Sequence, residues 1–193
     1  MKRVPVRLRR ATPGDAAALA ALYRDIRRWL LDRGNRQWRD ERFTAQTLRR
    51  DIGRAPILVA TSDRRIVGAV SVTWRDPDFW PDHTSHDAVY IRRLVIARRV
   101  AGRGVADALL AGVATLARRY RRAHLRLDCA PLEPLARIYR RLGFTLVDES
   151  KLGGYRVFRF HQSLAAHPFT PPCAPGRPRS GRAALSYRPC PRP

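Results

Sequence analysis

Apolar side chains recur every three or four residues in four stretches of the chain, the spacing that gives a helix one buried face. The helices that this spacing predicts cover residues 15–34, 44–52, 104–121 and 133–142. Thr44 is a suitable N-cap for the second helix, because its hydroxyl can accept a hydrogen bond from a main-chain N–H. Gly143 marks the end of the last helix, as glycine commonly does.

Shorter stretches rich in β-branched residues lie between these helices and predict strands. The strands are expected at residues 6–10, 57–60, 66–73, 89–96, 124–128, 144–147 and 155–160. Residues 61–65 are polar and form the five-residue connection of a hairpin, and Gly153-Gly154 turns the chain between the last two strands. Residues 74–87 are polar and hold two prolines, which predicts a loop.

The order of these elements indicates the fold class. Strand and helix alternate in the second half of the chain, which favours an α/β sheet with a βαβ core from Val89 to Leu127. A chain of 193 residues fits one domain of ordinary size, which we place at residues 1–164. Residues 165–193 hold eight of the fifteen prolines and five arginines but no acid, so we expect a disordered tail there.

Charge and composition narrow the classes of partner. The formal net charge of +23 would suit a nucleic-acid partner. Nearly all of the positive charge is arginine spread along the chain, however, and alanine and proline are also frequent, which is typical of a very GC-rich genome. We therefore do not expect nucleic-acid binding.

The chain also lacks the signals of other compartments. No stretch approaches the roughly 20 apolar residues of a membrane-spanning helix, and no apolar signal segment follows the basic start, so we expect a cytoplasmic protein without a membrane partner. Cys129, Cys173 and Cys190 form no CxxC pair, so we expect neither a disulfide nor a metal site.

The turn at Gly102-Arg103-Gly104 is the first candidate for chemistry. A glycine-rich turn from a strand into a helix leaves main-chain N–H groups free to bind a pyrophosphate, and Arg98, Arg99 and Arg103 can add charge. The alternatives are a tight turn without a ligand and a dinucleotide site, although the third glycine of the dinucleotide pattern is missing.

Around this turn the sequence resembles the GNAT superfamily of N-acetyltransferases. The resemblance rests on RLVIARRVAGRGVADALL (93–110), RLDC (126–129) and LARIYRRLGF (135–144), and it extends over residues 6–160. It implies a mixed, mostly antiparallel central sheet flanked by helices, with a βαβ core that binds acetyl-CoA. It also implies transfer of the acetyl group to a primary amine by direct attack.

The resemblance assigns a set of residues to acetyl-CoA binding. These are Leu94, Val95, Ile96, Ala101, Gly102, Arg103, Gly104, Val105 and Ala106, with the main chain of Leu94 and Ile96 on the pantetheine. Two positions depart from the family pattern. Ala101 stands where the family has Arg or Gln, and Leu132 stands where it often has Asn.

By the same resemblance, Tyr139 protonates the departing CoA thiolate. Its helical spacing with Leu135 and Leu142 also fits a core residue. The general base stays open: an ungapped alignment puts Tyr90 where many relatives carry a glutamate. The candidates are Asp87, His86, His83, Glu133 and ordered water.

Residues 74–83 place three acids beside two tryptophans. This cluster could attract a cationic amine, or it could be a solvated loop in which aspartate favours turns. A metal site from Asp82, His83, His86 and Asp87 lacks a recognisable spacing, so no metal is expected. The acceptor and a homodimer both stay open, and the alternative function is a non-catalytic protein that senses acyl-CoA or binds nucleic acid.

Overall fold

The computed structural model describes residues 2–36, 38, 41–83, 85–152 and 154–164. The elements in chain order are β1 (Arg7–Arg10), the 3₁₀ turn η1 (Pro13–Asp15), α1 (Ala16–Leu31), α2 (Ala45–Arg54), β2 (Ile57–Ser62), β3 (Arg65–Thr73), β4 (Ala88–Ile96), the 3₁₀ turn η2 (Arg98–Val100), α3 (Val105–Arg119), β5 (His124–Cys129), α4 (Glu133–Arg141), β6 (Thr145–Leu152) and β7 (Tyr155–Ser163). The tail expected at residues 165–193 and Gly153 of the expected turn lie outside the described residues. No helix within these ranges is long and apolar enough to cross a bilayer.

Seven strands form a single sheet in the order β1-β2-β3-β4-β5-β7-β6. β4 and β5 run parallel and are connected through α3, whereas the other neighbouring pairs in the described chain are antiparallel. The prediction of a mixed, mostly antiparallel sheet with a βαβ core is therefore confirmed.

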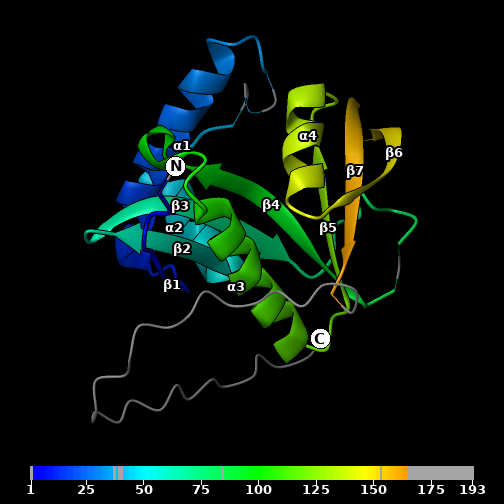
Figure 1. Ribbon diagram of the computed structural model, residues 1–193, viewed down its shortest axis with the longest axis horizontal. Coiled ribbons are helices and arrows are strands. Elements are labelled where there is room, and N and C mark those ends of the chain that lie inside the picture. Colours follow the sequence, from blue (N-terminus) through cyan, green and yellow to red (C-terminus); the bar gives the residue numbers. More distant parts are fainter. Residues whose placement is uncertain (1, 37, 39–40, 84, 153, 165–193) are drawn as a thin grey trace.

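Two helices cover one face of the sheet (Figure 1). α3 packs closely on β3, where a methyl group added to Gly68 would lie 3.0 Å from the side chains of Val105 and Leu109. α4 lies on the same face further along the sheet, where the rings of Tyr139 and Phe160 have centroids 5.5 Å apart. Leucine, valine and alanine side chains of α3 are buried and belong to the main hydrophobic core.

The opposite face is covered by α1 and α2 over the first four strands (Figure 1). Tyr23 of α1 is buried against this face, and its hydroxyl donates a hydrogen bond of 3.2 Å to the main-chain oxygen of Arg93. α2 begins as predicted at Thr44, whose hydroxyl accepts from the N–H of Thr47. Further along the sheet, the segment between β3 and β4 covers this face instead of a helix.

β4 contains a β-bulge. The pairs on either side of it are Ser71–Arg92 and Ala69–Val95, so β4 has one residue more than β3 in this interval. Arg93 has a φ of 52°, in the left-handed region. A bulge bends its strand, and the pairing of β4 with β5 ends at Ile91 and Leu127, just before this point. The two parallel strands therefore separate beyond Ile91.

The structure corrects the predicted hairpin between β2 and β3. Its connection is not five residues long: β2 continues to Ser62 and β3 begins at Arg65, so only Asp63 and Arg64 form the turn. Their φ angles of 48° and 63° match the two-residue turn that suits the twist of paired strands. The polar residues beside the turn still pair, because ladder hydrogen bonds come from the main chain.

The last two strands are also longer than predicted, since β6 extends to Leu152 and β7 to Ser163. Every second residue of β6 is exposed to solvent. Its polar side chains gave no apolar run, so the full length of the strand was not predicted.

Candidate active site

A cavity of about 890 Å³ lies where β4 and β5 separate. This volume is usual for a small-molecule site, for which roughly 300–1,000 Å³ is typical. The cavity is lined by β4 from Ile91 to Ile96, the end of β5 and α4 on the inside, and by parts of α1, α2 and the start of β7 towards solvent. It therefore passes between the two covered faces of the sheet.

The edge of β4 that faces β5 is open along the cavity. The described sheet has no β4–β5 pair beyond Ile91 and Leu127, so the main-chain groups of the residues that follow on this edge have no strand partner. On its other edge β4 stays paired, with Ile96 opposite Gly68. An extended ligand chain can add to such an edge as an extra strand would.

The glycine turn precedes α3 at one end of this edge. Gly102 and Gly104 have φ angles of 73° and 81°, which glycine adopts without strain. The first N–H groups of α3 have no intrahelical partner, as in any α-helix, and no side chain of the described chain caps them. The side chain of Arg3 lies beside Gly104, 3.3 Å from where a Cβ would be, and adds positive charge that the sequence pattern did not indicate.

The nine residues expected to bind acetyl-CoA lie in two stretches of the chain, 94–96 and 101–106, separated by residues 97–100. Leu94, Val95, Ile96 and Ala106 line the cavity. Ala101, Gly102, Arg103, Gly104 and Val105 form the turn beside it and the first residue of α3. Of the arginines expected to add charge, Arg98 instead stacks its guanidinium 3.9 Å from the ring centroid of Trp29.

Tyr139 lines the cavity from α4. Its ring packs against Phe160 and Phe144, at centroid distances of 5.5 and 6.2 Å. No group in the described ranges forms a hydrogen bond with its hydroxyl. Burial raises the pKa of Tyr139 above its usual range, and Cys129 and Asp128 add to the effect, so the phenol stays protonated at neutral pH.

Cys129 also lines the cavity, at the end of β5. Burial, with a smaller contribution from the charge of Asp128, raises the pKa of its thiol to about 12. The thiolate is the reactive form of cysteine, so this thiol is a poor nucleophile at neutral pH.

Asp128 and Arg92 lie on the other face of the sheet at the point where the strands separate, and both line the cavity. Arg92 forms an ion pair of 2.7 Å with Asp76, whose side chain is only 2% exposed. Burial raises the pKa of Asp128 more than the charge of Arg92 lowers it, and with the charge of Asp76, which also raises it, the pKa is about 6. The alternation of Leu125 and Leu127 towards the core could have indicated that Asp128 faces the opposite side.

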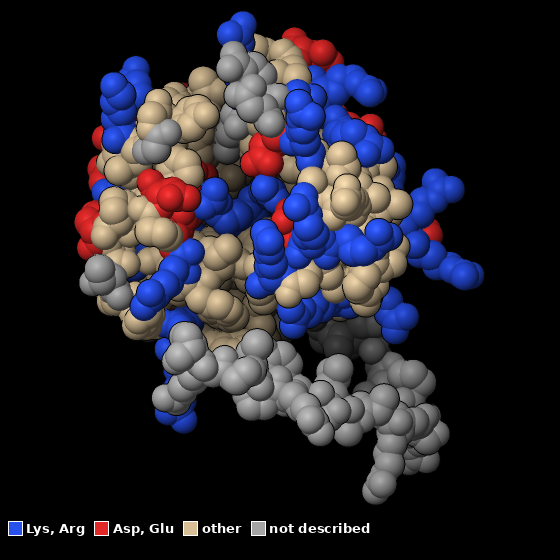
Figure 2. All heavy atoms as spheres, turned by 180° about the vertical axis from the view of Figure 1, so that it is seen from behind, with Lys and Arg blue, Asp and Glu red and all other residues tan. Residues whose placement is uncertain are grey.

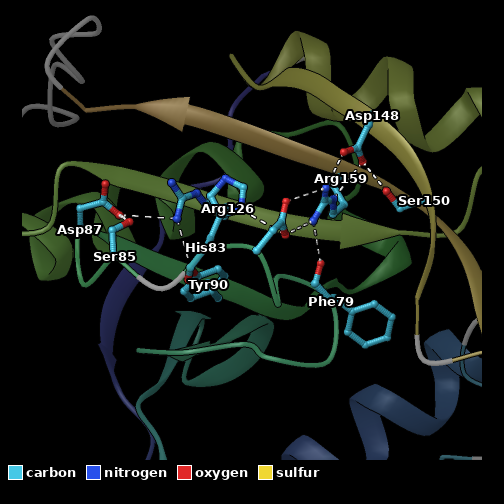
Figure 3. Close-up of polar contacts among 10 residues, drawn as sticks. Phe79, His83, Ser85, Asp87, Tyr90, Arg126, Asp148, Ser150 and Arg159 are labelled. Carbon is cyan, nitrogen blue, oxygen red and sulfur yellow. Dashed lines mark hydrogen bonds and ion pairs between the residues drawn. The ribbon is translucent and has the colours of Figure 1, made fainter.

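The segment between β3 and β4 folds back over this face instead of standing in solvent. Trp80 is 2% exposed and lies between the guanidinium groups of Arg126 and Arg159, at 5.5 and 4.9 Å. Arg159 also binds Asp82 at 2.6 Å and Asp148, as Figure 3 shows for the Arg159–Asp148 contact.

Neither interpretation holds for the whole segment, because two of its acids are paired with arginines whereas Asp78 is exposed and has no ion pair in the described chain. Asp76 and Asp82 are paired with arginines, so they are not free to attract a cationic amine. A solvated loop would not bury Trp80 either. Of the described residues in this segment, only Phe79 lines the cavity.

The four residues considered as general base do not line the cavity. Asp87 accepts from Ser85 and lies 3.5 Å from Arg126, in the network of Figure 3. His83 and His86 belong to the same segment, and Glu133 forms an exposed ion pair with Arg140. Tyr90, at the position of the family glutamate, is buried and its hydroxyl accepts from Arg126.

Arginine dominates the outer part of the cavity. Arg93 binds both Glu41 and Asp51, at 3.0 and 2.8 Å. Apart from Arg98, which stacks on Trp29, four more arginines line the cavity without an ion pair in the described part of the chain, namely Arg36, Arg42, Arg50 and Arg54. We call these four residues the arginine rim. Figure 2 shows Lys and Arg side chains gathered around a hollow on the face seen from behind.

Known proteins share this architecture. The profile of a family described as acetyltransferase (GNAT) domain matches residues 26–155. The uncharacterized N-acetyltransferase YesJ of Bacillus subtilis (strain 168) is 27% identical over 152 residues, 75% of this chain and 83% of YesJ. A GNAT-family acetyltransferase from Listeria monocytogenes has a TM-score of 0.66 at 22% identity, over 83% of this chain and 95% of that one. YncA of Salmonella typhimurium, solved with its cofactor acetyl-CoA, has a TM-score of 0.64 at 18% identity, over 89% and 98%.

Proposed function

The chain belongs to the GNAT family of acetyltransferases, and from this we propose that it transfers the acetyl group of acetyl-CoA to a primary amine by direct attack. Family membership makes it an acetyl-CoA-dependent acyltransferase. The observation that carries the proposal is the open edge of β4 in a cavity of about 890 Å³, with the glycine turn beside it and Tyr139 opposite.

In the proposed reaction, acetyl-CoA supplies an activated acetyl thioester. The main chain of Leu94 and Ile96 binds the pantetheine arm, and Gly102, Gly104 and the start of α3 bind the pyrophosphate. The amine nitrogen forms a bond to the acetyl carbon while the carbon–sulfur bond breaks. Tyr139 donates its proton to the departing thiolate, which gives free CoA.

We also propose that the acceptor carries a negative group in addition to its amine. In the outer cavity Glu41 and Asp51 already bind Arg93, whereas the arginine rim has no carboxylate partners in the described chain. A polycationic acceptor would meet unpaired guanidinium groups, which repel it. A carboxylate or phosphate on the acceptor would instead form charge-assisted hydrogen bonds with the rim.

The test is the release of free thiol from acetyl-CoA by the full chain with a panel of amines. The panel contains L-glutamate and phosphoethanolamine as anionic amines, ethanolamine as a neutral one and spermidine as a polycation. We expect kcat/KM to be at least about tenfold higher for an anionic amine than for spermidine, and added salt to reduce the difference.

Each part of the proposal has its own contradicting result. If CoA at about a millimolar does not raise the melting temperature, the cofactor site is wrong. CoA binding without thiol release for any amine would favour the non-catalytic alternative. Preference for spermidine would contradict only the anionic acceptor.

A further inference from the structure

Asp128 is the one acid lining the cavity that has no ion pair within the described residues. Glu41 and Asp51 are held by Arg93. Asp128 forms no hydrogen bond with another side chain in the described chain. It lies near Arg92, but the guanidinium of Arg92 is already bound to Asp76. Its carboxylate is thus available to a ligand.

Its place on β5 puts this carboxylate on the face of the sheet where the arginine rim lies. Asp128 follows Leu127, the last residue of β5 that pairs with β4, so it stands where the cavity begins. It pairs with Arg159 of β7, whose side chain lies on the face covered by the β3–β4 segment. The arginine rim belongs to the α1–α2 region over the same face.

Tyr139 approaches the same point from the opposite face. The two groups are close enough for the charge of Asp128 to raise the pKa of Tyr139. A carboxylate and a phenol therefore flank the end of β5, one on the face of the arginine rim and one on the face of α3 and α4. In the proposed reaction the amine loses protons and the thiolate gains one, so a base and an acid can act from these two sides.

We propose that Asp128 is the general base that removes a proton from the ammonium group of the acceptor. This inference rests on the proposed acetyl transfer. An alkyl ammonium group has a pKa of about 10.4, so only about one molecule in a thousand is a free amine near pH 7.5. Asp128 takes one proton and passes it to solvent. After attack the nitrogen loses a second proton, which balances the proton that Tyr139 gives to the thiolate.

The surroundings of Asp128 suit this role. Burial raises its pKa to about 6, so it is ionised at pH 7.5 and still basic enough to accept a proton. The charged and titratable groups around it are Arg92 on β4, Asp76 in the β3–β4 segment, Arg159 on β7, Cys129 next to it and Tyr139 on α4. Arg159 is held by Asp82 and Asp148.

The kinetic test compares Asp128→Asn with Asp87→Asn in the full chain. Both replace a carboxylate by an amide of the same size, but Asp87 lies outside the cavity. With the best amine of the panel, we expect Asp128→Asn to lower kcat/KM at least about tenfold at pH 7.5 and to remove the limb that rises near pH 6. Asp87→Asn should keep kcat/KM within about twofold of the wild-type value and should keep the limb that rises near pH 6.

A second nucleophile separates proton removal from other roles of Asp128. Hydroxylamine is mostly unprotonated at neutral pH, so it needs no base before it attacks. We expect Asp128→Asn to lower its acetylation by less than about threefold. A loss equal to that with the alkyl amine would mean that Asp128 positions the acceptor, and would overturn the assignment as base.

Stability gives a readout that does not depend on the acceptor. Because folding raises the pKa of Asp128, its contribution to stability is full below about pH 4 and is lost as the pH rises through about 6. Asp128→Asn should therefore raise the melting temperature by about 2–5 °C at pH 8, with no gain near pH 4. Burial raises the pKa of Asp87, but Ser85, Arg126 and His124 together lower it by more, so its pKa is lowered overall. Asp87→Asn should therefore not raise the melting temperature.

The failures can be told apart. If wild-type protein acetylates no amine, the proposed function falls and the inference falls with it. If wild-type protein is active and Asp128→Asn keeps both its rate and its pH profile, only the inference is wrong. CoA should still raise the melting temperature of Asp128→Asn, which shows that the variant is folded.

Discussion

At the scale of single residues, the side chain of Tyr139 has two environments. Its ring packs with Phe144 and Phe160, as a core residue would, while it lines the cavity and its hydroxyl has no partner in the described chain. The core interpretation and the acid interpretation therefore apply to different atoms of one side chain. A substitution that removes only the hydroxyl oxygen therefore distinguishes the two interpretations.

Tyr139→Phe should lower turnover at least about tenfold at saturating acetyl-CoA while CoA affinity stays close to wild type. The melting temperature should stay within a few degrees, because the ring and its contacts are kept. Steady-state kinetics and thermal unfolding measure the two effects. Unchanged turnover, under conditions where chemistry limits the rate, would leave protonation of the thiolate to solvent.

The two members of the candidate acid–base pair differ in how far the sequence could reveal them. Tyr139 lies in a contiguous segment, LARIYRRLGF, that is similar to a family motif. The choice of Asp128 rests on three structural facts about residues far from it in sequence. These are the end of the β4–β5 pairing at Ile91, the burial of Asp76 and the ion pair between Asp76 and Arg92. No local pattern encodes these, so Asp128 could not be chosen as a candidate base from sequence.

At the scale of elements, the contact between β3 and α3 fixes the start of the helix. Gly68 allows Val105 and Leu109 to approach the strand closely. Val105 is the first residue of α3, directly after Gly104. The position of the proposed pyrophosphate site is therefore coupled to a packing contact on the sheet.

Gly68→Ala should lower the melting temperature by about 3–8 °C and weaken CoA binding, because the new methyl group would lie 3.0 Å from two α3 side chains and displace the helix. Gly53→Ala is the matched control. Gly53 lies near the end of α2 with no atom within 4 Å of the added carbon, so alanine should be neutral or slightly stabilising. Equal effects of both variants on CoA affinity would contradict this coupling.

At the scale of the whole molecule, the order of elements and the parallel pair followed from the sequence, because helical and strand periodicities alternate clearly from Val89 to Leu127. The fold of residues 74–87 could not be predicted in this way. That segment has no periodicity, and its position depends on ion pairs with Arg92 and Arg159 from distant strands. The sequence therefore indicated the scaffold and the cofactor side better than the acceptor side.

Deletion of residues 166–193 should leave turnover and melting temperature close to those of the full chain, because the composition of this segment cannot form a core. The cut must lie beyond Leu164. This residue is 7% exposed, and its N–H donates to the oxygen of Ala123 at 2.8 Å. A large loss of activity or stability would show that the segment packs on the domain.

The bulge in β4 also has a consequence for the genetics of this protein. Because β4 has one residue more than β3 between its flanking pairs, loss of a single codon at Arg93 would leave both flanking pairs in register. The strand would become straighter, and its pairing with β5 could extend past Ile91 into the present cavity. Because Arg93 also binds Glu41 and Asp51, such a deletion should lower stability as well as activity, whereas Arg93→Ala keeps the extra residue and removes only the ion pairs.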